Sequence, residues 1–129
     1  PRDLRSLPEY CELVAQHYAV PIPASYPVVG IDAFRTTTGV HAAATIKAQN
    51  KGDSWLADRI YSGIPASMFG REQVIEIGPM SGASNIIYWL TVRGFTASDD
   101  LVERICSAAK ASDRTLGDDE LYALSGEVG

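Results

Sequence analysis

The feature that most constrains the fold of this chain is how little of it can form a β-strand. Gln73–Gly78 is the best strand candidate because it is rich in β-branched residues, but one strand cannot build a sheet alone. Elsewhere, apolar residues recur at helical spacing between turn signals. The sequence therefore predicts a mostly α fold, made of small helical subdomains with at most one or two short strands.

Length and charge narrow the class of protein. The chain has 129 residues, of which 46% are hydrophobic and 21% charged, as expected for one globular domain. Its net charge of −5 argues against nucleic acid and anionic membranes as partners. No apolar run reaches the ~20 residues of a membrane span, and Cys11 and Cys106 have neither metal nor redox spacing. We expect a cytoplasmic protein with reduced thiols.

The first segment, residues 1–24, is predicted to be a helix followed by a proline linker. Ser6–Glu9 matches a capping box, and Pro8 is tolerated in the first helical turn. An apolar stripe is expected at Leu7, Cys11, Val14 and Tyr18. His17 lies in the last turn, where a structural role is favoured. The linker is expected to be an extended strut containing Pro21, Pro23 and Pro27.

Two further subdomains are predicted, over residues 25–72 and 73–129. The first has a short helical turn at Ile31–Arg35, an alanine-rich helix over 40–49 and a short helix over 54–60, whose inward residues are expected to be Trp55, Leu56 and Ile60. In the second, Ser81 is the expected N-cap of a helix over 82–93. Two more helices are expected to begin after Ser98 and Gly117.

One histidine stands out as a candidate for chemistry. His41 follows Gly39 closely, at the start of the alanine-rich helix, where an imidazole could exchange protons near neutral pH. On spacing alone, a histidine packed in the core or bonded to nearby backbone is the favoured interpretation. Gly78–Gly82 could offer helix amides to an anion, although a plain helix cap is again favoured. No metal site is expected from this chain.

Four blocks of sequence together resemble the region that follows the barrel in the 2-isopropylmalate synthase and homocitrate synthase family. The family pattern is a P-[IV]-V-G-x-x-A-F approach, a [ST]-G-[IV]-H turn, a tyrosine followed by proline and [VF]-G, and a G-K-H-S-G helix start. The matching residues here are 27–34, 38–41, Tyr61 with Pro65, Phe69 and Gly70, and 77–82. Their order within about sixty residues is more specific than any single block.

The resemblance implies a Claisen-type condensation of acetyl-CoA with a 2-oxo acid. It implies a TIM barrel, missing from this chain, that binds a divalent metal (Mg, Mn or Zn). His41 and Tyr61 would then be catalytic lid residues that reach over the barrel of the partner subunit in a homodimer, with Thr38 and Gly39 binding substrate. Under this hypothesis 2-oxoisovalerate is the favoured 2-oxo acid, and homocitrate and citramalate synthases are the alternatives.

The chain also departs from the family pattern. Pro79 and Met80 replace the two basic residues of the G-K-H-S-G block, and Ala42–Ala44 replace polar residues common after the histidine. A different 2-oxo acid or a divergent branch would account for both. The rival interpretation is a non-catalytic helical module for dimerisation or regulation, in which His41 is structural. Under either interpretation, this chain alone is expected to lack condensation activity.

Overall fold

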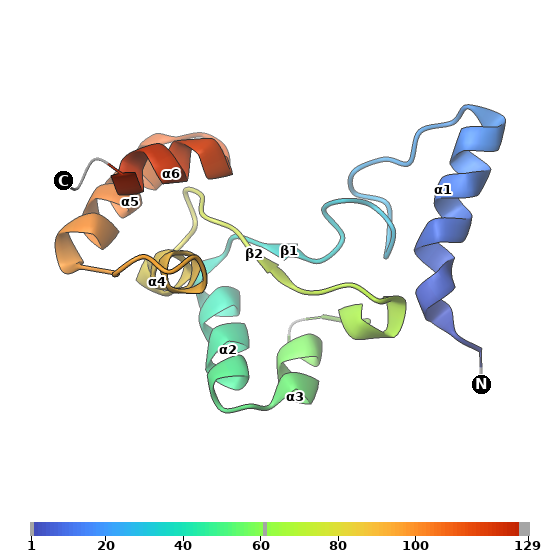
Figure 1. Ribbon diagram of the computed structural model, residues 1–129, viewed down its shortest axis with the longest axis horizontal. Helices are drawn as coiled ribbons and strands as arrows, with labels where there is room; N and C mark the ends of the chain where they lie inside the picture. Colours follow the sequence, from blue (N-terminus) through green and yellow to red (C-terminus); the bar gives the residue numbers. More distant parts are fainter. Residues whose placement is uncertain (1, 61, 127–129) are drawn as a thin grey trace.

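The computed structural model describes residues 2–60 and 62–126 and confirms the mostly α fold. The elements in the described residues are η1 (Leu4–Ser6), α1 (Leu7–Tyr18), β1 (Arg35–Thr36), α2 (Gly39–Asn50), α3 (Ser54–Arg59), η2 (Ala66–Phe69), β2 (Val74–Ile75), α4 (Ala83–Val92), α5 (Asp99–Ala111) and α6 (Asp118–Gly126). Helix α1 lies at one end of the molecule and α4–α6 at the other, with the strands, α2 and α3 between them (Figure 1).

The two strands pair in parallel at the centre of the molecule. Arg35 lies opposite Val74 and Thr36 opposite Ile75, and the amide of Val74 donates to the carbonyl of Phe34 at 2.8 Å. Parallel strands need a long crossover, which here contains α2, α3 and η2. The expected helical turn at Ile31–Arg35 is therefore wrong, because turns and then β1 occupy this segment.

Helix α2 packs against α3 on one side and α4 on another. Its buried residues are small, namely Ala42, Thr45 and Ala48, so neighbouring helices can approach closely. The prediction that Trp55 and Leu56 point inward is wrong: their side chains are 63% and 39% exposed, while Ala57 is buried. We attribute this to the close packing of α3 against α2. The space between the two helices accommodates the small side chain of Ala57 but not an indole.

The larger hydrophobic core joins α4, α5 and α6. It contains Ile77, Ile86, Trp89, Leu90, Leu101, Ile105, Ala109 and Leu121. The predicted inward face of α4 is confirmed, and α5 begins as expected with the Ser98 hydroxyl accepting from the amide of Leu101 at 3.4 Å. The connection between α5 and α6 contacts the segment that follows β2, because the amide of Leu116 donates to the carbonyl of Ile77 at 2.8 Å.

A smaller apolar cluster lies toward α1. Phe34, Ala66 and Phe69 are buried there, flanked by Leu4, Leu7, Val28 and Ala33. Arg71 closes this region, because its Nη1 donates to the carbonyls of Val28 and Gly30 at 2.8 and 2.7 Å. These bonds hold Val28, whose φ of 66° is unusual for a β-branched residue.

The prediction that the segment with Pro21, Pro23 and Pro27 forms an extended strut is wrong. After Pro23 the chain folds back in successive turns, with the amide of Gly30 donating to the carbonyl of Tyr26 and that of Asp32 to Ala24, both at 2.9 Å. Gly30 permits this, because a Cβ there would lie 2.3 Å from the carbonyl oxygen of Ala24. The prolines therefore begin a compact looped segment rather than a rigid spacer.

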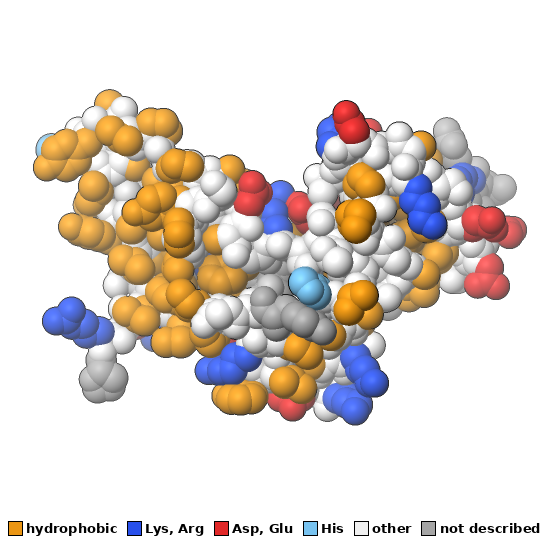
Figure 2. Space-filling model, turned by 180° about the vertical axis from the view of Figure 1, so that it is seen from behind, with side chains coloured by type: hydrophobic (Ala, Val, Ile, Leu, Met, Phe, Trp, Pro, Cys, Tyr) orange, Lys and Arg blue, Asp and Glu red, His pale blue; other side chains and the backbone are white. Residues whose placement is uncertain are grey.

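Helix α1 differs from its predicted form at both its cap and its face. The hydroxyl of Ser6 donates to the carbonyl of Asp3 at 3.2 Å and makes no cap bond to α1, so the predicted capping box is wrong. In the described residues, no α1 side chain is buried, and Tyr18 is 71% exposed. Of the predicted stripe, Leu7, Cys11 and Val14 are half-buried, and Leu7 packs against the smaller apolar cluster, whereas Tyr18 is exposed. Figure 2 shows hydrophobic side chains gathered over this end of the molecule.

The predicted division into residues 1–24, 25–72 and 73–129 stays a prediction. The pairing of β1 with β2 and the packing of α2 on α4 both connect the second range to the third. Across the described residues, no helix combines the length and the apolar character that crossing a membrane would require.

Candidate active site

His41 lines a small polar pocket between β1 and α2. The pocket has a volume of about 150 Å³ and is lined by Ala33, Phe34, Arg35, Thr36, His41, Thr45, Ile60, Ser62 and Gln73. The pocket thus brings together residues from both β1 and α2 and from the later segments around Ile60–Ser62 and Gln73. Polar side chains and backbone predominate in this lining, which suits a group that exchanges protons with a bound molecule.

The local sequence explains how His41 reaches the pocket. Gly39 begins α2 and Thr38 is its N-cap residue, so His41 lies in the first helical turn. The hydroxyl of Thr45, one turn further on, donates to the carbonyl of His41 at 3.1 Å. His41 is half-buried and lines the pocket, so a ligand in the pocket could contact its side chain.

Tyr61, the second predicted catalytic residue, lies outside the described residues. Its neighbours Ile60 and Ser62 both line the pocket that His41 lines. The hydroxyl of Ser62 accepts from Nε2 of Gln73 at 2.7 Å, which connects this edge of the pocket to the residue before β2. The chain on either side of position 61 is therefore brought to the predicted site.

Thr38 and Gly39, the predicted substrate-binding residues, do not line this pocket. Gly39 instead contacts the turn that precedes α4: its amide donates to the carbonyl of Met80 at 3.0 Å. A Cβ on Gly39 would lie 2.8 Å from the backbone nitrogen of Gly82. The structure thus provides a packing reason for a glycine here, and the substrate-binding role of both residues stays a prediction.

Asn85 was not predicted from the sequence, and Ser81 has a different role from the predicted one. The predicted N-cap role of Ser81 is wrong, because α4 begins at Ala83 with Gly82 as its N-cap. Ser81 and Asn85 are both buried, and their side chains bond to the loop that leads into α2. Its position three residues after the N-cap could have predicted the bond from the Gly82 amide to Oδ1 of Asn85, but not the bonds to the loop.

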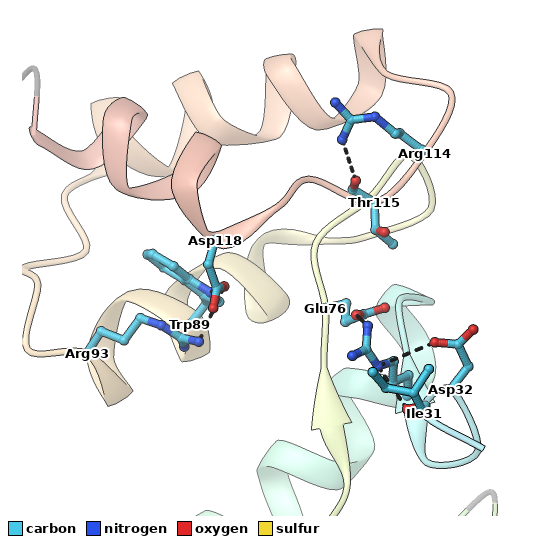
Figure 3. Close-up of polar contacts among 9 residues, drawn as sticks. Ile31, Asp32, Glu76, Trp89, Arg93, Arg114, Thr115 and Asp118 are labelled. Carbon is cyan, nitrogen blue, oxygen red and sulfur yellow. Dashed lines mark hydrogen bonds and ion pairs between the residues drawn. The ribbon is translucent and has the colours of Figure 1, made fainter. Parts of the chain in front are cut away.

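A second cavity, of about 400 Å³, lies between β2 and the α5–α6 connection. Figure 3 shows Arg93 directed toward Asp118 and Arg114 donating to the backbone carbonyl of Thr115. Nη1 of Arg35 lies 2.6 Å from Oε1 of Glu76, and Nη2 of Arg93 lies 3.5 Å from Oδ1 of Asp118. The guanidinium of Arg93 also lies 4.2 Å from the centre of the Trp89 ring. These charges are compensated within the chain, so we interpret this cavity as structural.

The donor groups of this chain do not suit a metal ion. In the part of the chain that the structure describes, no group of three or more His, Cys, Asp or Glu side chains lies close enough to hold one. That a barrel outside this chain binds the divalent metal implied by the family resemblance stays a prediction. Cys11 and Cys106 are free cysteines at opposite ends of the molecule.

Comparison with known proteins supports the resemblance that the motifs indicate. No family model matches this chain. Homocitrate synthase of Pyrococcus horikoshii is 28% identical over 109 residues, and (R)-citramalate synthase of Aquifex aeolicus is 30% identical over 88 residues. A probable 2-isopropylmalate synthase of Ignicoccus hospitalis is 28% identical over 98 residues.

These matches cover most of this chain but little of each relative. They span 84%, 68% and 76% of the chain, and 27%, 15% and 22% of the respective relatives. The chain is therefore related to one segment of much longer synthases. The family to which this segment belongs is that of the homocitrate, citramalate and 2-isopropylmalate synthases.

Proposed function

We propose that this chain is part of a synthase that condenses acetyl-CoA with a 2-oxo acid, and that it supplies His41 to the active site. The single observation that carries the proposal is the convergence of the family-like motifs on one pocket. His41 comes from the [ST]-G-[IV]-H block, the approach block contributes Ala33 and Phe34, and Ile60 and Ser62 flank position 61.

His41 would act in proton transfer. A neutral imidazole can take a proton from the acetyl methyl group or activate the water that cleaves the thioester product, and the imidazolium can return it. Tyr61 would hydrogen-bond the substrate or the developing oxyanion. Relatives with three different synthase names match at similar identity, so the proposal extends to a 2-oxo acid as a class and to no single one.

We further propose that the full synthase is a cytoplasmic homodimer. The supporting observation is the exposed apolar surface of α1 and the segment after it, where Tyr10, Leu13 and Tyr18 are each more than 60% exposed. Monomeric proteins seldom leave large contiguous apolar patches uncovered. The same observation favours the second candidate function, a helical dimerisation or regulatory module without catalysis.

Substitution in the full synthase separates these two functions. His41→Ala is expected to lower kcat by about 10²–10⁴-fold with assembly unchanged, because it removes a general acid–base group. Tyr61→Phe is expected to lower kcat without affecting assembly. The measurements are thiol release from acetyl-CoA with each 2-oxo acid, and sedimentation.

His17→Ala provides a matched control, because His17 is exposed on α1 and packs edge-on against Tyr18. It is expected to leave turnover unchanged. Wild-type turnover in the His41→Ala variant, together with loss of assembly, would favour the non-catalytic module.

A further inference from the structure

The loop before α2 is held by two buried side chains from the start of α4. The carbonyl oxygen of Thr37 accepts from Oγ of Ser81 at 2.7 Å and from Nδ2 of Asn85 at 3.1 Å. Asn85 is fully buried and Ser81 is 9% exposed. Such bonds are favoured, because the buried amide of Asn85 and the buried hydroxyl of Ser81 would be costly to leave without partners.

The same two side chains also hold the segment that follows β2. Nδ2 of Asn85 donates to the carbonyl of Glu76 at 2.9 Å, and its Oδ1 accepts from the amide of Gly82 at 3.3 Å. Oγ of Ser81 accepts from the amide of Gly78 at 2.9 Å. We call Ser81, Asn85 and the backbone groups they bond the loop clamp. It continues the β1–β2 connection beyond the last strand residues.

A backbone contact adds to the loop clamp on the side nearer His41. The amide of Gly39 donates to the carbonyl of Met80, and the two backbones approach so closely that a Cβ on Gly39 would overlap Gly82. Thr37 and Gly39 are therefore both fixed to the start of α4. These are the residues that set where α2 begins.

The consequence for His41 follows from helix geometry. His41 lies in the first turn after these two anchor points, so the loop clamp fixes the backbone that carries the imidazole relative to β1 and β2. Positioning of this kind matters in catalysis, because a displacement of about 1 Å can cost about 10²-fold in rate.

We propose that Ser81 and Asn85 are positioning residues for His41. They hold the imidazole at the reacting atoms through the Thr37 carbonyl and do not themselves touch substrate. This inference rests on the proposed function, since it assigns the loop clamp a role in the same site.

A double-mutant cycle in the full synthase tests the inference. Ser81→Ala removes the shorter bond to Thr37 and is expected to lower kcat by about 10–10²-fold, with a small change in the KM for acetyl-CoA. In the His41→Ala background the same substitution is expected to have no further effect on kcat, because there is no imidazole left to position. A residue that only stabilised the fold would lower the rate in both backgrounds.

Two further measurements make the cycle specific. Ser84→Ala, three residues on and outside the loop clamp, is the matched control and is expected to keep wild-type kcat. The pH profile of kcat in Ser81→Ala is expected to keep the inflection that His41→Ala removes, at a lower plateau. Ser81→Ala is expected to fold, because Asn85 still bonds the Thr37 carbonyl.

The outcomes distinguish this inference from the function on which it rests. Wild-type turnover of His41→Ala would overturn the proposed function. Loss of turnover in His41→Ala, combined with wild-type kcat in Ser81→Ala or with losses that multiply in the double variant, would overturn the positioning role alone. Failure of Ser81→Ala to fold would also overturn it, since Ser81 would then act on the fold.

Discussion

Gly39 shows how two opposing effects meet at a single residue. A glycine in a helix is less favourable than alanine by about 1 kcal/mol, so on intrinsic preference an alanine here would stabilise α2. The close approach of Gly39 to the backbone of Gly82 opposes this, because a Cβ would lie 2.8 Å from a nitrogen that cannot swing away. The steric effect is expected to prevail, since relieving it requires α2 to move relative to α4.

We therefore predict that Gly39→Ala lowers the free energy of unfolding, by about 1–3 kcal/mol. The control is Gly126→Ala in α6, where a Cβ would meet nothing within 4 Å. Thermal and denaturant unfolding of both variants provide the measurement. A stability of Gly39→Ala at or above that of the unsubstituted protein would contradict the close contact.

At this scale the sequence predicts single residues well only where a local pattern specifies them. The Ser98 cap was predicted from adjacent residues and is confirmed, whereas the site roles of Gly39 and His41 stay predictions. Asn85 was missed because its partners, the carbonyls of Thr37 and Glu76, belong to loops distant in sequence. Nothing in the residues beside Asn85 indicates which loops will reach it.

At the scale of elements, the first turn of α6 combines a cap with an ion pair. Oε2 of Glu120 accepts from the amide of Gly117 at 2.8 Å, and both carboxylate oxygens pair with the guanidinium of Arg114. The side-chain bond to Arg114, followed by the bond from the Gly117 amide, lowers the pKa of Glu120 from 4.5 to about 2. The ionised form of Glu120 is thus favoured by folding.

This lowered pKa predicts a specific acid response. A carboxyl group with a depressed folded-state pKa stabilises the fold fully above its unfolded pKa, and this contribution is lost as the pH falls from about 4.5 to about 2. Glu120→Gln should remove that part of the acid transition, and salt should weaken it in the unsubstituted protein, because the pair is exposed. Circular dichroism during acid titration measures both effects.

The control for this prediction is Asp119→Asn, which removes a charge from the same turn without touching the bonds of Glu120 to Arg114. It is expected to leave more of the transition between pH 4.5 and 2 in place. Superimposable acid titrations of Glu120→Gln and the unsubstituted protein would show that the pair does not contribute.

Truncation of an apolar side chain is expected to lower the stability of the protein much more in α5 than in α1. Ile105 is fully buried in the α4–α6 core, and Ile105→Ala is expected to lose about 2–5 kcal/mol of stability. Leu13 on α1 is 64% exposed, so Leu13→Ala is expected to change stability by no more than about 0.5 kcal/mol. Denaturant unfolding compares the two, and equal losses would contradict the core assignment.

The same contrast explains which helices the sequence predicts correctly. The pattern of α4 and α5 identified both helices and their buried faces, because each packs against a continuous core. For α1 and α3 the apolar residues indicated a helix but not its surroundings. Periodicity reports which side chains share a face, whereas burial depends on whether another element covers that face.

At the scale of the whole molecule, the chain contains one side of the proposed active site. Under the proposed function, the metal and the 2-oxo acid would bind to a barrel outside this chain. The chain matches about a quarter or less of the length of the relatives described above. We predict that the isolated chain does not release thiol from acetyl-CoA with any 2-oxo acid. Turnover by the isolated chain comparable to that of the full synthase would contradict this division of the site.

The short parallel strand pair has a consequence for the order of folding. Its two strands are separated by about 40 residues of chain, so their pairing closes a long loop for very few backbone hydrogen bonds. The entropic cost of closing that loop is lower once α2 and α3 have formed and shortened the connection. Strand pairing and the bonds around His41 are therefore expected to form late, after the intervening helices, so that the site is completed in the last steps of folding.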